Sequence, residues 1–366
     1  MSENVSIIGA GTAGLIAAKH TARLGIETRV YDQRARPGMP IHASGIVSET
    51  GLNTLGMDYK NAITNKLIGA NIHAGGKVFR VRAKDPIAFV LDRMKLNEIC
   101  YDEAERAGAK IGMGKRIVAD AFDSMARNGV LIGADGAVSS VARHFSMGHM
   151  ADHVLTYKKE FNVKIDEPGI VNLFFDRNVS PGLFGWMCPN ANDILEVGVG
   201  ISPKYGNSAH AMSKFVKTEE VSAIIDGAKE LGGGASIIPL ARRKKIYDNR
   251  GVLLVGDAAG QVKATTGGGI VFGGNGAVLA AEIATEHIRN GMPLSVYEKR
   301  YAKRYGTDML FHKMINRIYS NFGHTALGAM ITISNAIGID GFLGKYGDMD
   351  RPSLMLKRFF LRTLSE

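Results

Sequence analysis

The stretch Val5–Gly14 reads V-S-I-I-G-A-G-T-A-G, an apolar run that leads directly into three spaced glycines, Gly9, Gly11 and Gly14. In the pattern G-x-G-x-x-G, the first glycine permits a tight turn and the second lets a pyrophosphate approach the backbone. The third lets the following helix pack on the strand. Asp32 follows a second expected strand, about 20 residues downstream, where a carboxylate accepts hydrogen bonds from a ribose. The stretch therefore predicts a βαβ unit with a dinucleotide at the start of its helix.

The composition is that of an ordinary globular protein. Its 366 residues are 45% hydrophobic and 22% charged, which suggests about two domains. Two cysteines, Cys100 and Cys188, are too few for a disulfide framework or a cysteine-based metal cluster, so we expect no metal site. Since we recognise neither a charged leader nor an apolar run of about 20 residues, we expect a cytoplasmic location without a spanning helix.

The formal net charge of +10 favours an anionic partner. Basic runs lie at Arg242–Lys245, Lys299–Arg304 and Arg351–Arg362. Because the chain shows neither an RNP signature nor zinc-finger spacing, we expect no nucleic acid partner. Phosphorylated substrates or an acidic membrane surface fit the charge better, and a solvated basic face is the alternative for each single run.

The periodicity of apolar residues predicts two kinds of sheet separated along the chain. Nucleotide-binding strands are expected at Val5–Ile8, Ile26–Tyr31, Val130–Asp135 and Gly251–Asp257. Strands of a different sheet are expected at Phe161–Glu167, Ile170–Phe175, Leu183–Met187 and Ile194–Ile201. Helices are expected at Leu15–Leu24, Leu91–Gly108, Ser139–His144, Asn275–Asn290 and from Ser295–Arg317 onward. A cofactor domain interrupted by a substrate-binding sheet explains this order.

The expected domain boundaries follow from the same order. We place the cofactor domain at residues 1–75, 91–155 and 246–294, a first sheet insertion at 76–90, the main substrate-binding sheet at 156–245, and a helical C-terminal region at 295–366.

Two charged residues lie at expected element boundaries. Arg93 follows Asp92 at a helix start, where a guanidinium could reach cofactor phosphate or ribityl oxygens, or form a surface salt bridge instead. Asp135 ends a strand within G-A-D-G, where it could contact the cofactor or form an Asx-type turn.

The segment Gly256–Phe272 reads G-D-A-A-G-Q-V-K-A-T-T-G-G-G-I-V-F and is the most specific of these motifs. Asp257 lies at a strand end, where a carboxylate can bind the hydroxyls of a ribityl chain. Gly267, Gly268 and Gly269, followed by Ile270, form a helix start whose bare N–H groups can face a flavin ring. Such donors would stabilise negative charge that develops on the reduced ring.

Taken together, G-x-G-x-x-G, D-R, G-A-D-G and G-D-A-A-G resemble FAD-dependent proteins of the p-hydroxybenzoate hydroxylase type. Within that group, Q-V-K-A-T-T-G-G-G-I resembles the geranylgeranyl reductase family of archaea and plants. The segment F-G-W-M-C-P-N is similar to the family's aromatic-x-Trp-x-Phe-Pro-Lys element. Phe184, Trp186 and Pro189 match it, whereas Cys188 and Asn190 depart from it. The resemblance covers roughly residues 1–300.

The stretch Pro40–Ser48 also resembles the family's flavin-facing loop, which commonly holds a cysteine. This chain has Ala43 and Ser44 there, followed by Gly45, and the resemblance implies that these three contact the cofactor. His42 in the same loop is a candidate proton relay, or a turn histidine bonded to the backbone.

The resemblance implies an α/β fold of this type, with a Rossmann-like FAD-binding domain, an antiparallel-sheet substrate domain and a helical C-terminus. It implies FAD as cofactor and a reductase that saturates C=C bonds of geranylgeranyl chains in digeranylgeranylglycerophospholipid. The electron donor stays open among ferredoxin, NADPH and a deazaflavin. A flavin monooxygenase or halogenase is the alternative, because F-G-W-M-C-P is also similar to the W-x-W-x-I-P element of halogenases. A non-catalytic flavin-binding protein is a third possibility.

Few residues in the sequence indicate where the substrate binds. Phe184, Trp186 and Pro189 are the expected substrate contacts, with ordinary core packing as the alternative for Trp186, the only tryptophan. The proton donor is not identified by the sequence, and His42 and Trp186 are its weak candidates. Asn321–Ile339 lacks Lys, Arg, Asp and Glu, which suggests peripheral contact with the cytoplasmic membrane face or a buried helix.

Overall fold

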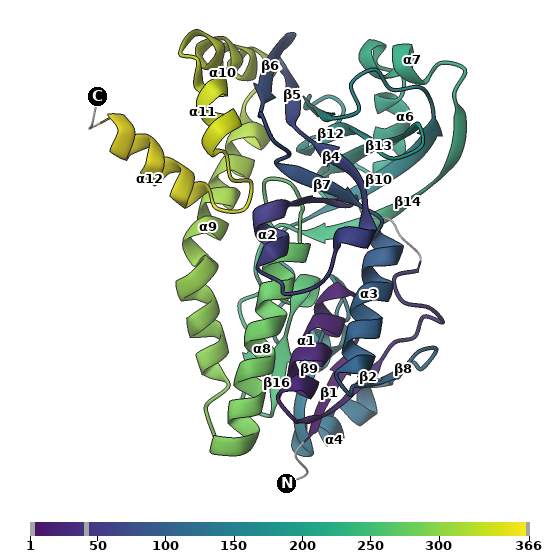
Figure 1. Cartoon of the computed structure of the whole chain (residues 1–366), viewed down its shortest axis with the longest axis vertical. Helices are drawn as coiled ribbons and strands as arrows, with labels where there is room; N and C mark the ends of the chain where they lie inside the picture. Colours follow the sequence, from purple (N-terminus) through teal and green to yellow (C-terminus); the bar gives the residue numbers. More distant parts are fainter. Residues whose placement is uncertain (1–3, 40–43, 364–366) are drawn as a thin grey trace.

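The computed structural model of the chain describes residues 4–39 and 44–363, with side chains through Phe359. Its described strands form three sheets, of six, seven and three strands. Figure 1 shows the six-stranded sheet with its helices at one end of the molecule and the seven-stranded sheet at the other. The long helix α9 (Ser295–Asn321) runs along one side and spans much of the distance between these two ends (Figure 1).

The six-stranded sheet is a Rossmann-like sheet. Its order is β15 (Tyr247–Asp248), β16 (Val252–Leu254), β9 (Gly129–Gly133), β1 (Asn4–Ile8), β2 (Glu27–Tyr31) and β8 (Lys110–Gly112). All neighbours pair in parallel except β15 and β16. The helices of this unit include α1 (Thr12–Arg23), α3 (Arg93–Arg106) and α8 (Ile270–Asn290). Parallel strands buried on both faces read as continuous apolar runs, which is why V-L-L-V and V-S-I-I were recognisable in the sequence.

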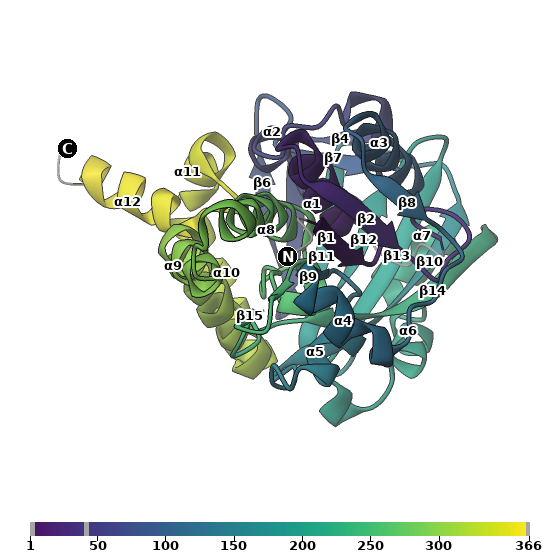
Figure 2. The same cartoon turned by 90° about the horizontal axis from the view of Figure 1, so that it is seen from below.

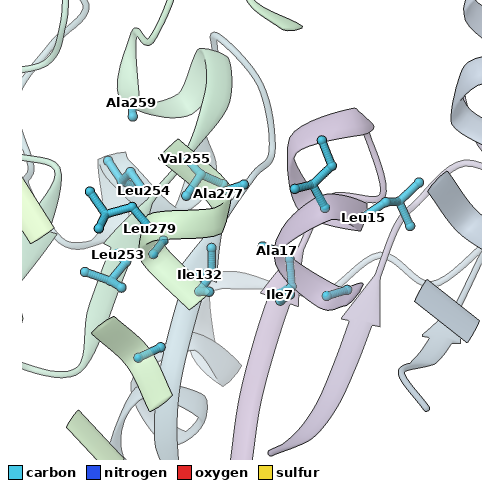
Figure 3. Packing of buried hydrophobic residues seen from close by; sticks show 14 of the residues in the cluster. Ile7, Leu15, Ala17, Ile132, Leu253, Leu254, Val255, Ala259, Ala277 and Leu279 are labelled. Atoms are coloured by element: carbon cyan, nitrogen blue, oxygen red, sulfur yellow. The ribbon is translucent and has the colours of Figure 1, made fainter. Parts of the chain in front are cut away.

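The core of this unit lies between the strands and α1 and α8. Figure 3 shows Ile7 and Ile132 of the strands in one cluster with Ala17 of α1 and Ala277 of α8. These four side chains are completely buried. Alanines and glycines are frequent where α1 and α8 pack against each other, and small side chains let two helix backbones approach closely.

The seven-stranded sheet is antiparallel except for one pair. Its order is β14 (Lys229–Pro239), β10 (His153–Asn162), β13 (Ile194–Ile201), β12 (Gly182–Pro189), β11 (Ile170–Phe175), β5 (Gly69–Ala74) and β6 (Lys77–Arg82), with β11 and β5 parallel. Helix α6 (Ser208–Phe215) packs on β10 and β13. The third sheet consists of β3 (Ile46–Ser48), β7 (Ala88–Leu91) and β4 (Ile63–Leu67).

Short helices occupy most of the remaining connections. They are α2 (Glu49–Asn53), α4 (Phe122–Arg127), α5 (Ser140–His144) and α7 (Glu219–Ile225), together with the 3-10 turns η1 (Lys60–Ala62), η2 (Ala119–Ala121), η3 (Pro203–Tyr205) and η4 (Gly256–Ala259).

The C-terminal region is helical. After α9 come α10 (His324–Ala336), α11 (Ile339–Tyr346) and α12 (Pro352–Thr363), and Figure 2 shows α12 projecting away from the body of the protein. Among the described residues, no single helix has the length and apolarity needed to cross a membrane. Helices α10 and α11 meet that test only as a pair, bent by 82° at their junction.

The predicted fold class is confirmed, and one predicted strand is wrong. Strands Ile170–Phe175 and Ile194–Ile201 have the predicted bounds. The strand predicted at Phe161–Glu167 is instead β10, which ends at Asn162. Lys158, Lys159 and Glu160 interrupt its apolar pattern, and Lys158 can be buried because the carboxylates of Glu160 and of the remote Glu196 pair with it. The domain boundaries stay a prediction.

Candidate functional site

A cavity of about 760 Å³ extends from the carboxyl ends of the Rossmann-like strands to the face of the seven-stranded sheet. One end is lined by the glycine turn after β1 and by the ends of β2 and β9. The middle is lined by the glycine-rich loop before α8, and the far end by apolar side chains of β11, β12 and β14. Ligands of open α/β sheets bind outside the carboxyl ends of the strands, so the cavity has the expected position.

The three glycines of the first turn have separate structural reasons. A Cβ atom on Gly9, which has φ of +108°, would lie 2.3 Å from the carbonyl oxygen of Ala134. A Cβ atom on Gly14 would lie 2.0 Å from the carbonyl oxygen of Gly9. Around Gly11 the same construction meets no described atom within 4 Å. Gly9 and Gly14 therefore allow the turn and helix to pack, while Gly11, at the N-cap of α1, leaves an open cradle that fits a phosphate.

Asp32 lies on the cavity wall at the end of β2 and is already surrounded by donors. Its carboxylate accepts hydrogen bonds from the Ala10 amide at 2.7 Å and from the Arg34 amide at 2.8 Å. The Arg34 guanidinium also donates to both of its oxygens. Burial alone would raise the pKa of Asp32, but the hydrogen bonds from Arg34 and Ala10 outweigh it and lower this pKa. Asp32 is therefore ionised, and its contact with a ribose hydroxyl stays a prediction.

Arg93 and Asp257 form the most constrained pair on the wall. Asp92 caps α3 by accepting from the amides of Met94 and Lys95, which fixes Arg93 as the first helical residue. The Arg93 guanidinium donates to Thr12 Oγ1 at 3.3 Å, and its buried Nε–H has no partner among the residues that the structure describes. Burial lowers the pKa of Arg93 and raises that of Asp257, and each partner's charge opposes the shift.

An unsatisfied guanidinium N–H beside a cavity fits a cofactor that supplies oxygen acceptors. A buried donor without a partner is destabilising in a folded protein, and a bound phosphate or hydroxyl would remove that penalty. Together with the open cradle at Gly11, this orphan donor is the observation that makes the wall suitable for a flavin dinucleotide.

The glycine-rich loop before α8 lies close to polar side chains. A Cβ atom on Gly268 would lie 2.9 Å from Lys263 Cε, and one on Gly269 would lie 2.9 Å from Asp257 Oδ1. Gly267 has φ of +73°, a conformation that favours glycine. Gly269 caps α8 without a side-chain hydrogen bond, so the first N–H groups of α8, from Ile270, remain available at the cavity.

Asp135 lines the cavity but is largely engaged elsewhere. Its carboxylate accepts from the hydroxyls of Ser139 and Ser140 and from the amides of Ser140 and Val141. It therefore anchors the first turn of α5 through amides five and six residues further along, and not through the Asx-type turn that was the alternative. A role in cofactor binding stays a prediction.

The apolar end of the cavity contains Phe184 and Trp186, together with Val171, Leu173, Leu183 and Ile238. The Phe184 and Trp186 rings meet edge to face at 6.1 Å between centroids. A Cβ atom on Gly198 of the neighbouring strand would lie 2.0 Å from Trp186 Cζ2, so the indole occupies the space that a side chain there would take. Both rings are buried in the protein yet border the cavity.

Not all of the remaining predicted site residues line the cavity. Ser44 lines the cavity, whereas His42 and Ala43 lie outside the described residues. Gly45 packs on β7, where a Cβ atom would lie 2.0 Å from the carbonyl oxygen of Leu91. Pro189 lies at the end of β12 and accepts a hydrogen bond from Asn65 on its carbonyl, away from the cavity lining. The roles assigned to these residues stay predictions.

Several lining residues were missed from the sequence. The cations Arg34, Lys115, Arg116 and Arg143 border the nucleotide end, where they suit an anionic ligand. Behind the apolar wall, Glu196 and Lys158 form a buried ion pair at 2.9 Å. A single charge within an apolar strand, such as Glu196 in I-L-E-V-G-V-G-I, was the signal that could have revealed that pair.

The two cysteines are poor candidates for thiol chemistry. Burial raises the pKa of Cys100 to about 12 and raises that of Cys188 well above its ordinary value. Both are buried, free thiols and remain protonated near neutral pH. Within the described ranges, the structure gathers no three His, Cys, Asp or Glu side chains able to hold a metal ion.

The chain shares its fold, a Rossmann-like sheet joined to a mostly antiparallel sheet, with FAD-dependent proteins. A family model described as an NAD(P)-binding Rossmann-like domain matches residues 7–65. Digeranylgeranylglycerophospholipid reductase 2 of Methanothermobacter thermautotrophicus is 27% identical over 355 residues, which cover 90% of this chain and 91% of that protein. The predicted resemblance to geranylgeranyl reductases is thereby confirmed.

Solved structures agree on the fold. A geranylgeranyl bacteriochlorophyll reductase-like protein from Thermoplasma acidophilum has a TM-score of 0.78 at 20% identity and covers 90% of both chains. The myxobacterial chondrochloren halogenase, described as a variant of FAD-dependent halogenases, has a TM-score of 0.68 at 16% identity and covers 96% of this chain and 92% of its own. Reductase-like and halogenase chains thus share this architecture.

Proposed function

We propose that the protein is an FAD-dependent reductase that saturates C=C bonds of geranylgeranyl chains in digeranylgeranylglycerophospholipid, an archaeal-type membrane lipid precursor. The observation that carries the proposal is the single cavity that joins a dinucleotide cradle at Gly11 to an apolar wall at Trp186. The similarity to curated reductases of that lipid, over most of both chains, supports the same substrate.

The chain's own residues would hold FAD along the polar part of the cavity. The N-terminus of α1 at Gly11 receives the pyrophosphate, and Asp32 accepts from the adenosine ribose. Arg93 and Asp257 provide a donor and an acceptor for the chain between phosphate and ring. When bound and reduced, FAD supplies a hydride.

The residues at the other end would position the alkene and exclude water. An isolated trisubstituted alkene is unactivated, so a proton has to reach one carbon together with the hydride or ahead of it. Positive charge then develops on the neighbouring carbon, and water would trap it. The apolar side chains Val171, Leu173 and Ile238, with the rings of Phe184 and Trp186, keep that end dry.

The C-terminal helices would bring the enzyme to its lipid at the cytoplasmic membrane face. Large apolar side chains are exposed there, on α9 (Leu310, Met314, Ile315), α10 (Met330, Ile333) and after α10 (Ile337). Arg317, Lys345 and Arg351 are exposed on the same region. Apolar residues flanked by cations suit an anionic bilayer surface, with insertion only to the level of the headgroups.

The test is an anaerobic stopped-flow experiment with the FAD-loaded protein, chemically reduced and mixed with digeranylgeranylglyceryl phosphate. Return of the oxidised flavin spectrum together with saturated product supports the proposal. A flavin that stays reduced until oxygen is admitted contradicts it and supports a monooxygenase or halogenase. Bound FAD that reacts with neither alkene nor oxygen-dependent substrates supports a flavin-binding protein.

A further inference from the structure

Behind the apolar wall, one buried carboxylate connects both sides of the cavity. Glu196 on β13 is 6% exposed. Its Oε1 atom accepts a hydrogen bond from Trp186 Nε1 at 2.8 Å and another from the Ser44 hydroxyl. Trp186 belongs to the substrate-side sheet, and Ser44 precedes β3 within the stretch that is expected to face the flavin. Both line the cavity, and Glu196 holds them together from behind.

The second oxygen of this carboxylate has a different partner. Lys158 Nζ donates to Glu196 Oε2 at 2.9 Å and to Glu160 Oε1 at 2.9 Å. Lys158 is 6% exposed, so its ammonium requires these acceptors. The sheet register explains the arrangement, because Lys158 and Trp186 both pair with Gly198, on opposite sides of β13. Glu196, two residues away, lies on the same face of that strand.

We propose that Glu196 is a positioning residue for the alkene substrate, because its carboxylate fixes the Trp186 indole on the cavity wall and ties it to Ser44. The proposal deepens the proposed function and rests on it for the substrate. A carboxylate is required since it has two acceptor oxygens, one for Trp186 and Ser44 and one for Lys158. An amide has a single acceptor oxygen and cannot serve both sides.

In the isosteric variant E196Q, one side chain can no longer accept hydrogen bonds from Trp186 and from Lys158 at the same time. In E196Q the Lys158 ammonium keeps Glu160 but loses its second carboxylate, and an NH₂ group facing this buried cation would be the most unfavourable arrangement. The amide oxygen therefore turns toward Lys158, and its NH₂ group meets the indole N–H. Trp186 is then released. In the double variant K158M/E196Q the cation is gone, and the amide oxygen is free to accept from Trp186 and Ser44 again. The proposal therefore predicts loss in the single variant and rescue in the double one.

Trp186 is the only tryptophan, so its fluorescence reports this position without background. In the FAD-loaded protein, we expect E196Q to change the emission maximum and lifetime and to increase access of a neutral quencher. K158M/E196Q should return all three toward the wild-type values. Glu230→Gln is the matched control, because Glu230 pairs at 2.7 Å with Lys159, the half-buried neighbour of Lys158, and should leave the emission unchanged.

Substrate kinetics provide the second readout. We expect KM for digeranylgeranylglyceryl phosphate to rise on the order of tenfold in E196Q, as for one lost charged hydrogen bond. Ser44→Ala, which leaves the ion pair intact, should raise KM in the wild-type background and add little in E196Q. Wild-type emission in E196Q, or no recovery of emission in K158M/E196Q, would overturn the proposal. The emission measurements need no turnover, so they decide whether Glu196 fixes Trp186 even if the lipid proves not to be a substrate.

Discussion

Lys263 Nζ lies 2.6 Å from Asp350 Oδ1, and this ion pair joins the glycine-rich loop before α8 to the segment between α11 and α12. Both side chains are at most 5% exposed. Ser48 also donates to Asp350, and the Asp350 carbonyl lies 3.2 Å from His312 Nε2. Residues from four remote parts of the chain therefore meet beside the cavity that Lys263 and Met349 line.

The first prediction concerns this ion pair. Asp350→Asn should lower the free energy of unfolding by about 3–5 kcal/mol, because it leaves a buried ammonium without its counter-ion. Urea denaturation monitored by circular dichroism measures the change. Asp102→Asn is the control, since Asp102 pairs with Arg106 on an exposed helix surface and should change stability little. Equal effects of the two substitutions would contradict the assignment.

The second prediction separates cofactor binding from folding at the glycine turn. Gly11→Ala should weaken FAD binding at least about tenfold, because a methyl group enters the phosphate cradle, while apo-protein stability changes by about 1 kcal/mol or less. Gly14→Ala should instead destabilise the protein, since its Cβ atom would lie 2.0 Å from the Gly9 carbonyl oxygen. Titration with FAD and urea denaturation of both variants measure the contrast. Unchanged FAD affinity in Gly11→Ala would contradict the cradle.

The third prediction is a pH dependence from His312. Burial, followed by the charge of Lys263, lowers the pKa of His312 to about 4. In the unfolded chain His312 takes up a proton near pH 6.5, whereas in the folded protein it does so only near pH 4. The stability that depends on neutral His312 is therefore fully present above pH 6.5 and is lost as the pH falls toward 4. The loss from this residue is of the order of 3 kcal/mol. His312→Gln should reduce the difference in stability between pH 7 and pH 5.

His20 provides an internal comparison for that measurement. Burial lowers its pKa to about 4 as well, so it contributes to the same pH range in both proteins. The free energy of unfolding of the wild-type protein should therefore fall more steeply with decreasing pH than that of His312→Gln. The variant should keep the smaller pH dependence that is due to His20. Identical curves for the two proteins would sink the assignment to His312.

The fourth prediction tests membrane contact. The double variant I333E/I337E should lose binding to vesicles that contain anionic lipid, because its two substitutions place charge on side chains that are 60% and 64% exposed on the proposed membrane surface. Co-sedimentation with anionic and zwitterionic vesicles measures it. Val118→Glu is the control, because Val118 is 62% exposed and lies before η2, outside the C-terminal helices. If Val118→Glu weakens binding equally, the C-terminal helices are not the contact surface.

Local patterns allowed much of the cofactor end to be predicted. Gly9, Gly11 and Asp32 depend on neighbours within a single βαβ unit, so their spacing in the sequence indicates their geometry. The glycine-rich loop at Gly267–Gly269 was recognisable for the same reason. Each of these residues lies on the wall of one cavity.

The substrate end could not be predicted to the same extent, because its structure depends on pairing between distant strands. A lysine is not expected in a sheet core unless a carboxylate lies beside it, and Glu196 is far from Lys158 in the sequence. The strand was therefore predicted to begin after Lys158, and its bounds were wrong. Asp350 lies beyond the part of the chain covered by the family resemblance, so sequence reasoning did not connect it with Lys263. Buried ion pairs between remote segments leave only isolated charges in the sequence.

Gly198 lies under the Trp186 indole, so the residues at positions 186 and 198 constrain each other during evolution. A side chain at position 198 is incompatible with the ring, whereas a smaller residue at position 186 would leave a void above the glycine. Substitutions at the two positions therefore have to occur as a pair. Among relatives, a bulkier residue aligned with Gly198 should accompany the loss of the aromatic ring, which makes this pair of positions a marker for a change of substrate.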